Sequence, residues 1–213
     1  VLSESVLNRR LKLGTFLGVG LYIHWSFGLM IAYIALTAYG DGLAGILYAI
    51  TLLMGVYLCV TLHEYGHVLA ARRFGIGAVD ITLLPIGGVA RLKSMPRIPW
   101  QELVVAVAGP AVNVVIVILL MCGLFTLCNE AVLIAFKQGI TSEIFGGGID
   151  QQTQETIEAV FLGRSFTSYA ITLLGVNLML VLFNMLPAFP MDGGRVFRSL
   201  LAMFLSYRRA TWI

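Results

Sequence analysis

The chain has 213 residues, of which 59% are hydrophobic and 12% are charged. Soluble domains carry about 25% charged residues, so this composition excludes an ordinary water-soluble domain. The mean hydropathy is +0.91, and several apolar runs are long enough to cross a bilayer. These features predict an all-α polytopic membrane protein. The net charge of +3 is small, and the basic residues cluster near the ends of apolar segments. This pattern is typical of topology signals and argues against a nucleic-acid partner.

The N-terminal part of the chain precedes two apolar runs. Residues 13–24, LGTFLGVGLYIH, contain spaced glycines and partly alternate, which predicts either a short strand at the membrane edge or the bent start of a helix. A first span is expected at about 25–39, and Gly40-Asp41-Gly42 predicts a tight turn. A second span is expected at about 43–74, which is too long for one crossing unless its end leaves the lipid.

A short motif, HEYGH at residues 63–67, lies near the end of the second span. Two histidines four residues apart on a helix differ by roughly 40° around the axis, so both imidazoles point the same way. This spacing suits two ligands of one zinc ion, and Glu64 between them can activate water. Residues 43–62 carry no charge. Ionisable residues that follow such a run are costly, so we expect them to have a function.

The residue pattern changes from that of an apolar span at residues 78–93, AVDITLLPIGGVARLK. Strand-forming residues flank Pro85 and Gly87-Gly88, which predicts a β-hairpin. An exposed hairpin edge can bind an extended peptide by β-augmentation, so this hairpin is our candidate for a substrate clamp. A third span is expected at about 102–127, broken at Gly109-Pro110.

The C-terminal part of the chain alternates between polar and apolar segments. Residues 129–166 hold five acids and two bases, and a fourth span is expected at about 167–186. Residues 184–195, NMLPAFPMDGGR, contain two prolines and two glycines, which predict an unwound segment before a short helix at about 195–207. The expected fold therefore has about four transmembrane helices, a short C-terminal helix and a small membrane-associated β-hairpin or sheet.

The distribution of charge predicts the orientation of the chain in a cell membrane. Basic residues cluster at 9–12, 72–73, 91–97 and 195–198, whereas 129–166 is acidic. By the positive-inside rule, the basic clusters face the cytoplasm and the acidic segment is an extracytoplasmic loop. The N-terminus is then expected on the cytoplasmic side. The end of the HEYGH helix, the hairpin and the Asp192-Gly193-Gly194 loop are expected on the same side, where three separate stretches can converge on one site.

A catalytic zinc ion needs three protein ligands and one open position. The one further histidine, His24, lies beside Trp25 and has the pattern of an interfacial residue. A carboxylate is therefore the better candidate for the third ligand. Asp192 is the strongest choice, because it follows Pro190 in a break of an apolar region. Unwound backbone at membrane depth is tolerated where it is buried in protein or lines a water-filled cavity.

Several motifs occur in a fixed order. HEYGH is followed by LLPIGGVARL at 83–92, AGPAVN at 108–113 and NMLPAFPMDGG at 184–194. Together they resemble the site-2 protease family of intramembrane zinc metalloproteases, over roughly residues 20–210. The resemblance favours the prokaryotic branch that carries CBS domains after the membrane core. Residues 1–213 would then be a single protease core and a fragment of a longer chain.

The resemblance implies roles for individual residues. His63, His67 and Asp192 would bind one zinc ion per chain, Glu64 would act as the general base, and Asn113 would be an oxyanion donor. The reaction would be hydrolysis of a peptide bond in or near a transmembrane segment of another membrane protein, with membrane lipid as the surroundings. An interhelical hydrogen bond is the alternative role for Asn113. The oligomeric state is left open.

Two other functions are compatible with parts of this pattern. A divalent-metal transporter also places His and Glu in membrane helices, but it needs ligands spread along the membrane normal. A catalytically silent scaffold would be expected to lack Glu64 or a ligand. Asn177 and Asn184 are interpreted mainly as structural, and Arg195 and Arg198 as topology anchors.

Overall fold

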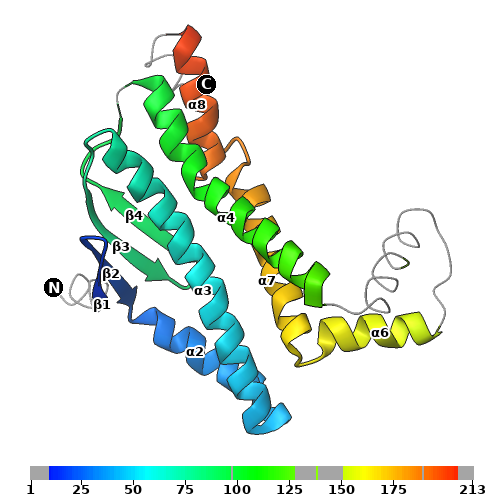
Figure 1. The fold of residues 1–213 in the computed structure, drawn as a ribbon. Helices are drawn as coiled ribbons and strands as arrows, with labels where there is room; N and C mark the ends of the chain where they lie inside the picture. Colours follow the sequence, from blue (N-terminus) through cyan, green and yellow to red (C-terminus); the bar gives the residue numbers. More distant parts are fainter. Residues whose placement is uncertain (1–9, 97, 128–137, 139–150, 189, 206–213) are drawn as a thin grey trace.

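The structure is a computed structural model that describes residues 10–96, 98–127, 138, 151–188 and 190–205 (Figure 1). Its elements, in chain order, are β1 Arg10–Phe16, β2 Val19–His24, α2 Ser26–Thr37, η1 Tyr39–Asp41, α3 Gly42–Arg73, β3 Ala78–Leu84, β4 Gly87–Leu92, α4 Pro99–Leu127, α6 Gln151–Leu162, α7 Phe166–Asn184 and α8 Asp192–Phe204.

Three helices of the described part are long and apolar enough to cross a membrane, namely Tyr39–Arg73, Pro99–Thr126 and Phe166–Asn184. They confirm a mostly helical, multi-pass membrane fold. The expected first span is the helix α2, which has 12 residues and is therefore about 18 Å long. That is shorter than the roughly 30 Å hydrocarbon core, so four full crossings stay a prediction.

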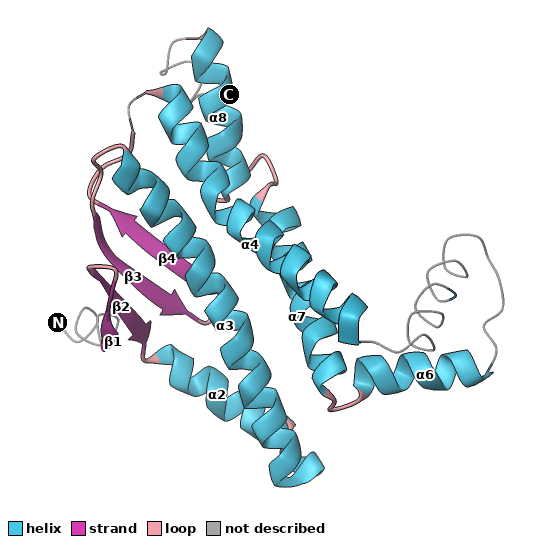
Figure 2. Cartoon of the chain, in the orientation of Figure 1, coloured by secondary structure: helices cyan, strands magenta, loops and turns pink. Residues whose placement is uncertain are grey.

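The strands form one sheet in the order β1-β2-β3-β4 (Figure 2). The predicted hairpin is confirmed as β3 and β4, and the strand alternative for residues 13–24 is correct. β1 and β2 are joined at Leu17 and Gly18, whose φ angles of 50° and 72° match a hairpin turn. β2 and β3 pair in parallel, with Gly20 opposite Asp80. The sheet is therefore larger than the sequence predicted.

One face of the sheet packs against α2 and α3 (Figure 1). Ile81 is fully buried, and it belongs to the same apolar cluster as Tyr57 of α3. The Tyr57 hydroxyl donates to the carbonyl oxygens of Leu84 and Pro85, each at 2.8 Å. These bonds attach the turn between β3 and β4 to the middle of α3, and this attachment holds β4 beside the HEYGH motif.

α3 and α4 approach closely because of a glycine. A Cβ on Gly66 would lie 2.6 Å from the carbonyl oxygen of Ala108. The predicted break at Gly109-Pro110 is wrong, since α4 continues through Pro110 as one helix. Proline is tolerated inside membrane helices where neighbouring helices and local adjustments compensate for the lost backbone bond.

Two further expectations concern the C-terminal half. α8 begins at Asp192, three residues before the predicted start, and the residues described between α7 and α8 are non-helical, as expected. Most of the predicted loop 129–166 lies outside the described residues, although α6 occupies 151–162.

A buried carboxylate joins three strands of the sheet. Asp80 on β3 accepts hydrogen bonds from the Arg91 guanidinium on β4, with Nε at 2.6 Å from Oδ1. Arg10 on β1 donates to Asp80 Oδ2 at 3.1 Å and to Thr82 at 3.2 Å. Hydrogen bonds from Arg91, aided by the charges of Arg91 and Arg10, hold the pKa of Asp80 below its usual range and outweigh the opposing effect of burial.

This cluster predicts a pH-dependent contribution to stability. At pH 7 the Asp80→Asn substitution should destabilise the fold by about 1–3 kcal/mol, because it weakens hydrogen bonds between charged groups. The folded pKa is lowered, so the contribution is complete above the unfolded value of about 3.9 and is lost as pH falls through the folded value. The melting temperatures of parent and variant, measured in detergent, should therefore differ by a constant amount from about pH 5 to about pH 7. In this range Asp is ionised in both the folded and the unfolded state. A difference that persists undiminished in strong acid would contradict this assignment.

Candidate metal centre

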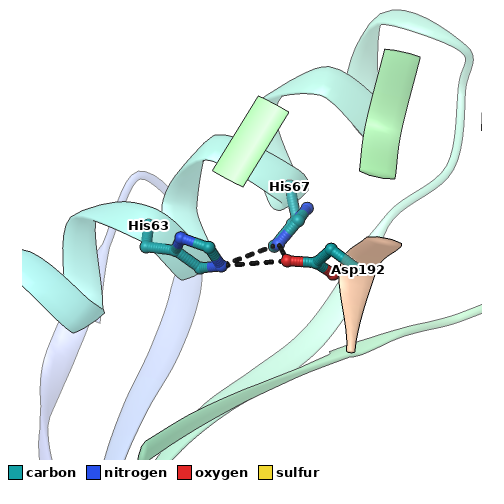
Figure 3. A group of neighbouring side chains, drawn as sticks. All are labelled: His63, His67 and Asp192. Carbon is teal, nitrogen blue, oxygen red and sulfur yellow. Dashed lines mark hydrogen bonds and ion pairs between the residues drawn. The ribbon is translucent and has the colours of Figure 1, made fainter. Parts of the chain in front are cut away.

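The last turns of α3 bring the two motif histidines together. His63 and His67 are each 5% exposed, and their Nε2 atoms lie 3.1 Å apart. Asp192, the first residue of α8, places Oδ2 at 3.1 Å from His63 Nε2 and 3.0 Å from His67 Nε2. Figure 3 shows the three side chains pointing toward one another. The three predicted ligands therefore meet, although Asp192 is far from the histidines in the sequence.

The tautomer of His67 follows from its backbone partner. Its Nδ1 lies 2.7 Å from the carbonyl oxygen of Val105 on α4. A carbonyl oxygen can only accept, so Nδ1 carries the hydrogen and the lone pair of the neutral ring is on Nε2. The Nε2 lone pair therefore faces His63 and Asp192.

The tautomer of His63 is set by a chain of three hydrogen bonds. The Leu173 carbonyl oxygen accepts from Asn177 Nδ2 at 2.8 Å, which fixes the orientation of that amide. Asn177 Oδ1 then accepts from Asn113 Nδ2 at 3.0 Å. Asn113 Oδ1 is left to accept from His63 Nδ1 at 2.8 Å. Both asparagines are completely buried, so His63 also directs an Nε2 lone pair into the site.

These constraints test whether the site fits a metal ion. Two imidazole nitrogens and a carboxylate oxygen lie within 4.8 Å of one another, and all three are acceptors. Three buried acceptors repel one another unless a cation lies between them. Two histidines and one carboxylate are a known catalytic zinc donor set that leaves a position open for water. The residues present therefore fit zinc.

A glycine of α4 provides the space for the two imidazoles. A Cβ on Gly109 would lie 2.7 Å from His63 Nε2 and still closer to His67 Nε2. Val105, Gly109 and Asn113 follow one another at intervals of four residues, so they share one face of α4. The sequence interpretation placed a break at Gly109-Pro110, whereas the structure shows that Gly109 leaves room for the two imidazoles.

The side chain of Glu64 extends from α3 to the edge strand β4. Its Oε2 accepts the backbone N–H of Ala90 at 2.8 Å. A Cβ on Gly88 would lie 2.7 Å from Glu64 Cγ, so this glycine leaves room for the acid beside the strand. The HEYGH motif, the hairpin and the Asp192 segment thus converge, as the sequence predicted.

Some contacts were not expected from the sequence. Arg198, interpreted as a topology anchor, instead forms an ion pair with the buried carboxylate of Glu102 on α4. Val105 acts through its backbone carbonyl, which leaves no signature in a sequence. His24 ends β2 and has its Nδ1 at 2.6 Å from Ser26 Oγ. It is not part of the three-residue metal-binding group found in the described residues.

Comparisons with known proteins agree with this geometry. The family model described as Peptidase family M50 matches residues 51–211. A zinc metalloprotease of Methanocaldococcus jannaschii is 31% identical over 208 residues, which is 97% of this chain and 50% of that protein. A protein of Synechocystis sp. is 32% identical over 210 residues, 93% of this chain and 46% of that protein. The chain thus spans about half the length of the curated relatives it matches.

A solved structure gives the same result for the fold. The site-2 protease from Methanocaldococcus jannaschii superposes with a TM-score of 0.59 at 29% identity, covering 95% of this chain and 76% of that one. The family model covers most of the residues, including all five of the HEYGH motif and Asp192. On these grounds the chain belongs to peptidase family M50, to which the motifs had already pointed.

Proposed function

We propose that this chain is an intramembrane zinc metalloprotease that hydrolyses a peptide bond in or near a transmembrane segment of another membrane protein. The observation that carries the proposal is the convergence of three buried acceptor atoms from α3 and α8 beside Glu64. The relatives support it, because one is named a zinc metalloprotease and a similar solved structure is a site-2 protease.

Each site residue has a part in this reaction. His63, His67 and Asp192 would hold one zinc ion, which would supply a Lewis acid that polarises the scissile carbonyl and lowers the pKa of water to about 7. Glu64 takes the proton from the attacking water and returns it to the leaving amine. Asn113 orients His63 by accepting from its Nδ1, which supports the interhelical alternative for this residue, and its contact with an oxyanion stays a prediction.

The substrate must lose its helical hydrogen bonds before its carbonyl can be attacked. β4 is the last strand of the sheet, so it pairs with β3 along one edge and with no other strand of the sheet along its second edge. The Ala90 N–H donates to Glu64, which means that it points away from β3. Backbone groups alternate along a strand, so Gly88 and Leu92 point the same way. We propose that an extended substrate pairs along this edge, beside the metal site.

The sheet also supports a four-crossing topology. β2 and β3 are neighbours in one sheet, so the chain must begin and end on the same side of the membrane between them. The span that includes η1 and α3 is long enough to cross once, so this arrangement supports a return crossing by α2. The positive-inside rule supports a cytoplasmic position for the N-terminus and for the site. Residues 1–213 would form one core, with 129–166 on the opposite side.

Three measurements on the purified chain in liposomes separate this function from its alternatives. We expect one zinc ion per chain by elemental analysis, cleavage of a fluorescent single-span test substrate, and no zinc flux across the membrane. Zinc flux without cleavage would identify a transporter. Zinc binding with neither flux nor cleavage of a panel of membrane substrates would identify a silent scaffold.

A further inference from the structure

The strand β4 turns its side chains alternately to the two faces of the sheet. A Cβ on Gly88 would lie 2.7 Å from Glu64 Cγ, so Gly88 belongs to the face that packs against α3. Val89 and Arg91 therefore lie on the outer face. Val89 is 46% exposed, and the side chain of Arg91 is 50% exposed. An extended substrate on the free edge of β4 would place alternate side chains beside these two residues.

The outer face of the sheet carries one positive charge in excess. The buried carboxylate of Asp80 forms ion pairs with both Arg10 and Arg91. Within the described residues, neither arginine has another carboxylate partner. Two guanidinium groups therefore share a single carboxylate, and an anionic side chain placed beside them would balance the charge of the cluster.

Arg91 is the arginine of this cluster that lies on the edge strand, whereas Arg10 belongs to β1 at the opposite edge. The Nε and Nη2 of Arg91 donate to Asp80, and its Nη1 forms no hydrogen bond within the described part of the chain. A guanidinium carries five N–H donors, so donors remain for a second partner. A substrate residue opposite Arg91 would have its Cβ about 4.5–5.5 Å from that of Arg91, a gap that a carboxylate side chain can span.

The position opposite Arg91 is also close to the chemistry. The N–H of Ala90, the preceding residue, donates to Glu64, which is the base in the proposed reaction. Neighbouring residues of a strand are about 3.3 Å apart. The substrate residue that meets Arg91 is therefore expected within a few residues of the cleaved bond.

We propose that Arg91 is a specificity-determining residue, which favours an acidic substrate side chain close to the cleaved bond and disfavours a basic one. The inference rests on the proposed function, and on the pairing of substrate along β4 in particular. Lys and Arg are frequent at the cytoplasmic ends of membrane spans. Repulsion by Arg91 would therefore reject many membrane proteins at a site on that side, so that specificity comes from repulsion as well as from attraction.

The test is the cleavage of single-span substrates by the purified chain in liposomes. The cleaved bond of one substrate is located by mass spectrometry, and Glu, Gln or Lys is then placed at each flanking residue in turn. We expect one position at which kcat/KM decreases from Glu to Gln to Lys. The Glu and Lys substrates should differ there by about 3- to 30-fold, the combined effect of an attractive and a repulsive cross-strand pair.

Two variants should change this Glu/Lys ratio in opposite directions. Arg91→Gln removes the excess charge, so the ratio should fall to near one. Asp80→Asn removes the compensating carboxylate, so the ratio should rise above that of the parent. Each ratio compares two substrates of the same enzyme, so a loss of folded protein cancels. Arg91→Lys keeps the charge without the planar fork and should retain part of the preference.

Lys12→Gln is the matched control for net charge. Lys12 is an exposed cation on β1, at the opposite edge of the sheet, so this variant should keep the ratio of the parent. An equal loss of preference in Lys12→Gln, an unchanged preference in Arg91→Gln, or equal cleavage of Glu and Lys substrates by the parent would overturn the specificity role and leave the proposed function intact. Cleavage of no substrate by the parent would overturn both.

Discussion

Replacing Glu64 by Gln should lower the rate of substrate cleavage by about 10²- to 10⁴-fold, the usual contribution of a general base, and leave the bound zinc in place. Gln has the shape of Glu but cannot take a proton from water. Its carbonyl oxygen can still accept the Ala90 N–H that now bonds to Glu64. The three metal ligands are unchanged, so the variant should separate chemistry from metal binding.

The measurement combines initial rates on a fluorescent membrane substrate with zinc content by elemental analysis. Glu158→Gln is a suitable control, because it makes the same chemical change at an exposed position of α6. The control should cleave like the parent. If Glu64→Gln retained zinc and also the full cleavage rate, Glu64 would not be the base.

Adding a single methyl group at Gly109 should prevent zinc binding. In Gly109→Ala the new Cβ would lie 2.7 Å from His63 Nε2 and closer still to His67 Nε2, well inside normal van der Waals contact. Either imidazole must turn away, or α4 must move off α3. Loss of a supporting contact costs about 10- to 100-fold in metal affinity, and we expect this direct steric displacement to cost more. Cleavage should be lost together with the metal.

The same substitution elsewhere on α4 is the control. A Cβ on Gly123 would meet nothing within 4 Å, so Gly123→Ala should bind zinc and cleave substrate like the parent. Both variants should fold, since alanine favours helix relative to glycine. Parent-like zinc stoichiometry in Gly109→Ala would show that the imidazoles lie elsewhere.

The candidate metal-binding group could be predicted because each of its residues belongs to a recognisable string in the sequence. Helical geometry alone places His63 and His67 on one face, and the Pro/Gly segment distinguishes Asp192 from the other acids. The β3–β4 hairpin was predictable for a similar reason, since its turn residues are adjacent in the sequence. In all these cases local sequence determines local geometry.

The remaining features depend on contacts between distant segments. The pairing of β2 with β3 requires α2 and α3 to return the chain to one place, which no local pattern specifies. A glycine at position 109 looks the same in the sequence whether it breaks a helix or leaves room for an imidazole. The Arg198–Glu102 pair joins two helices that are far apart in the sequence, and an arginine at a helix end resembles a topology signal until its partner is known.

The parallel pairing of β2 and β3 also has a consequence for the order of assembly. Gly20 can meet Asp80 only after the ribosome has delivered both strands and the intervening helices have entered the bilayer. Pairings between segments so distant in sequence form slowly. Until then the β1–β2 hairpin has no neighbour, with Phe16 and Leu17 more than half exposed even in the finished sheet. We expect the newly made chain to remain proteolytically silent during this interval, because β4 reaches Glu64 only after β3 has joined the sheet, and Asp192 is synthesised later still.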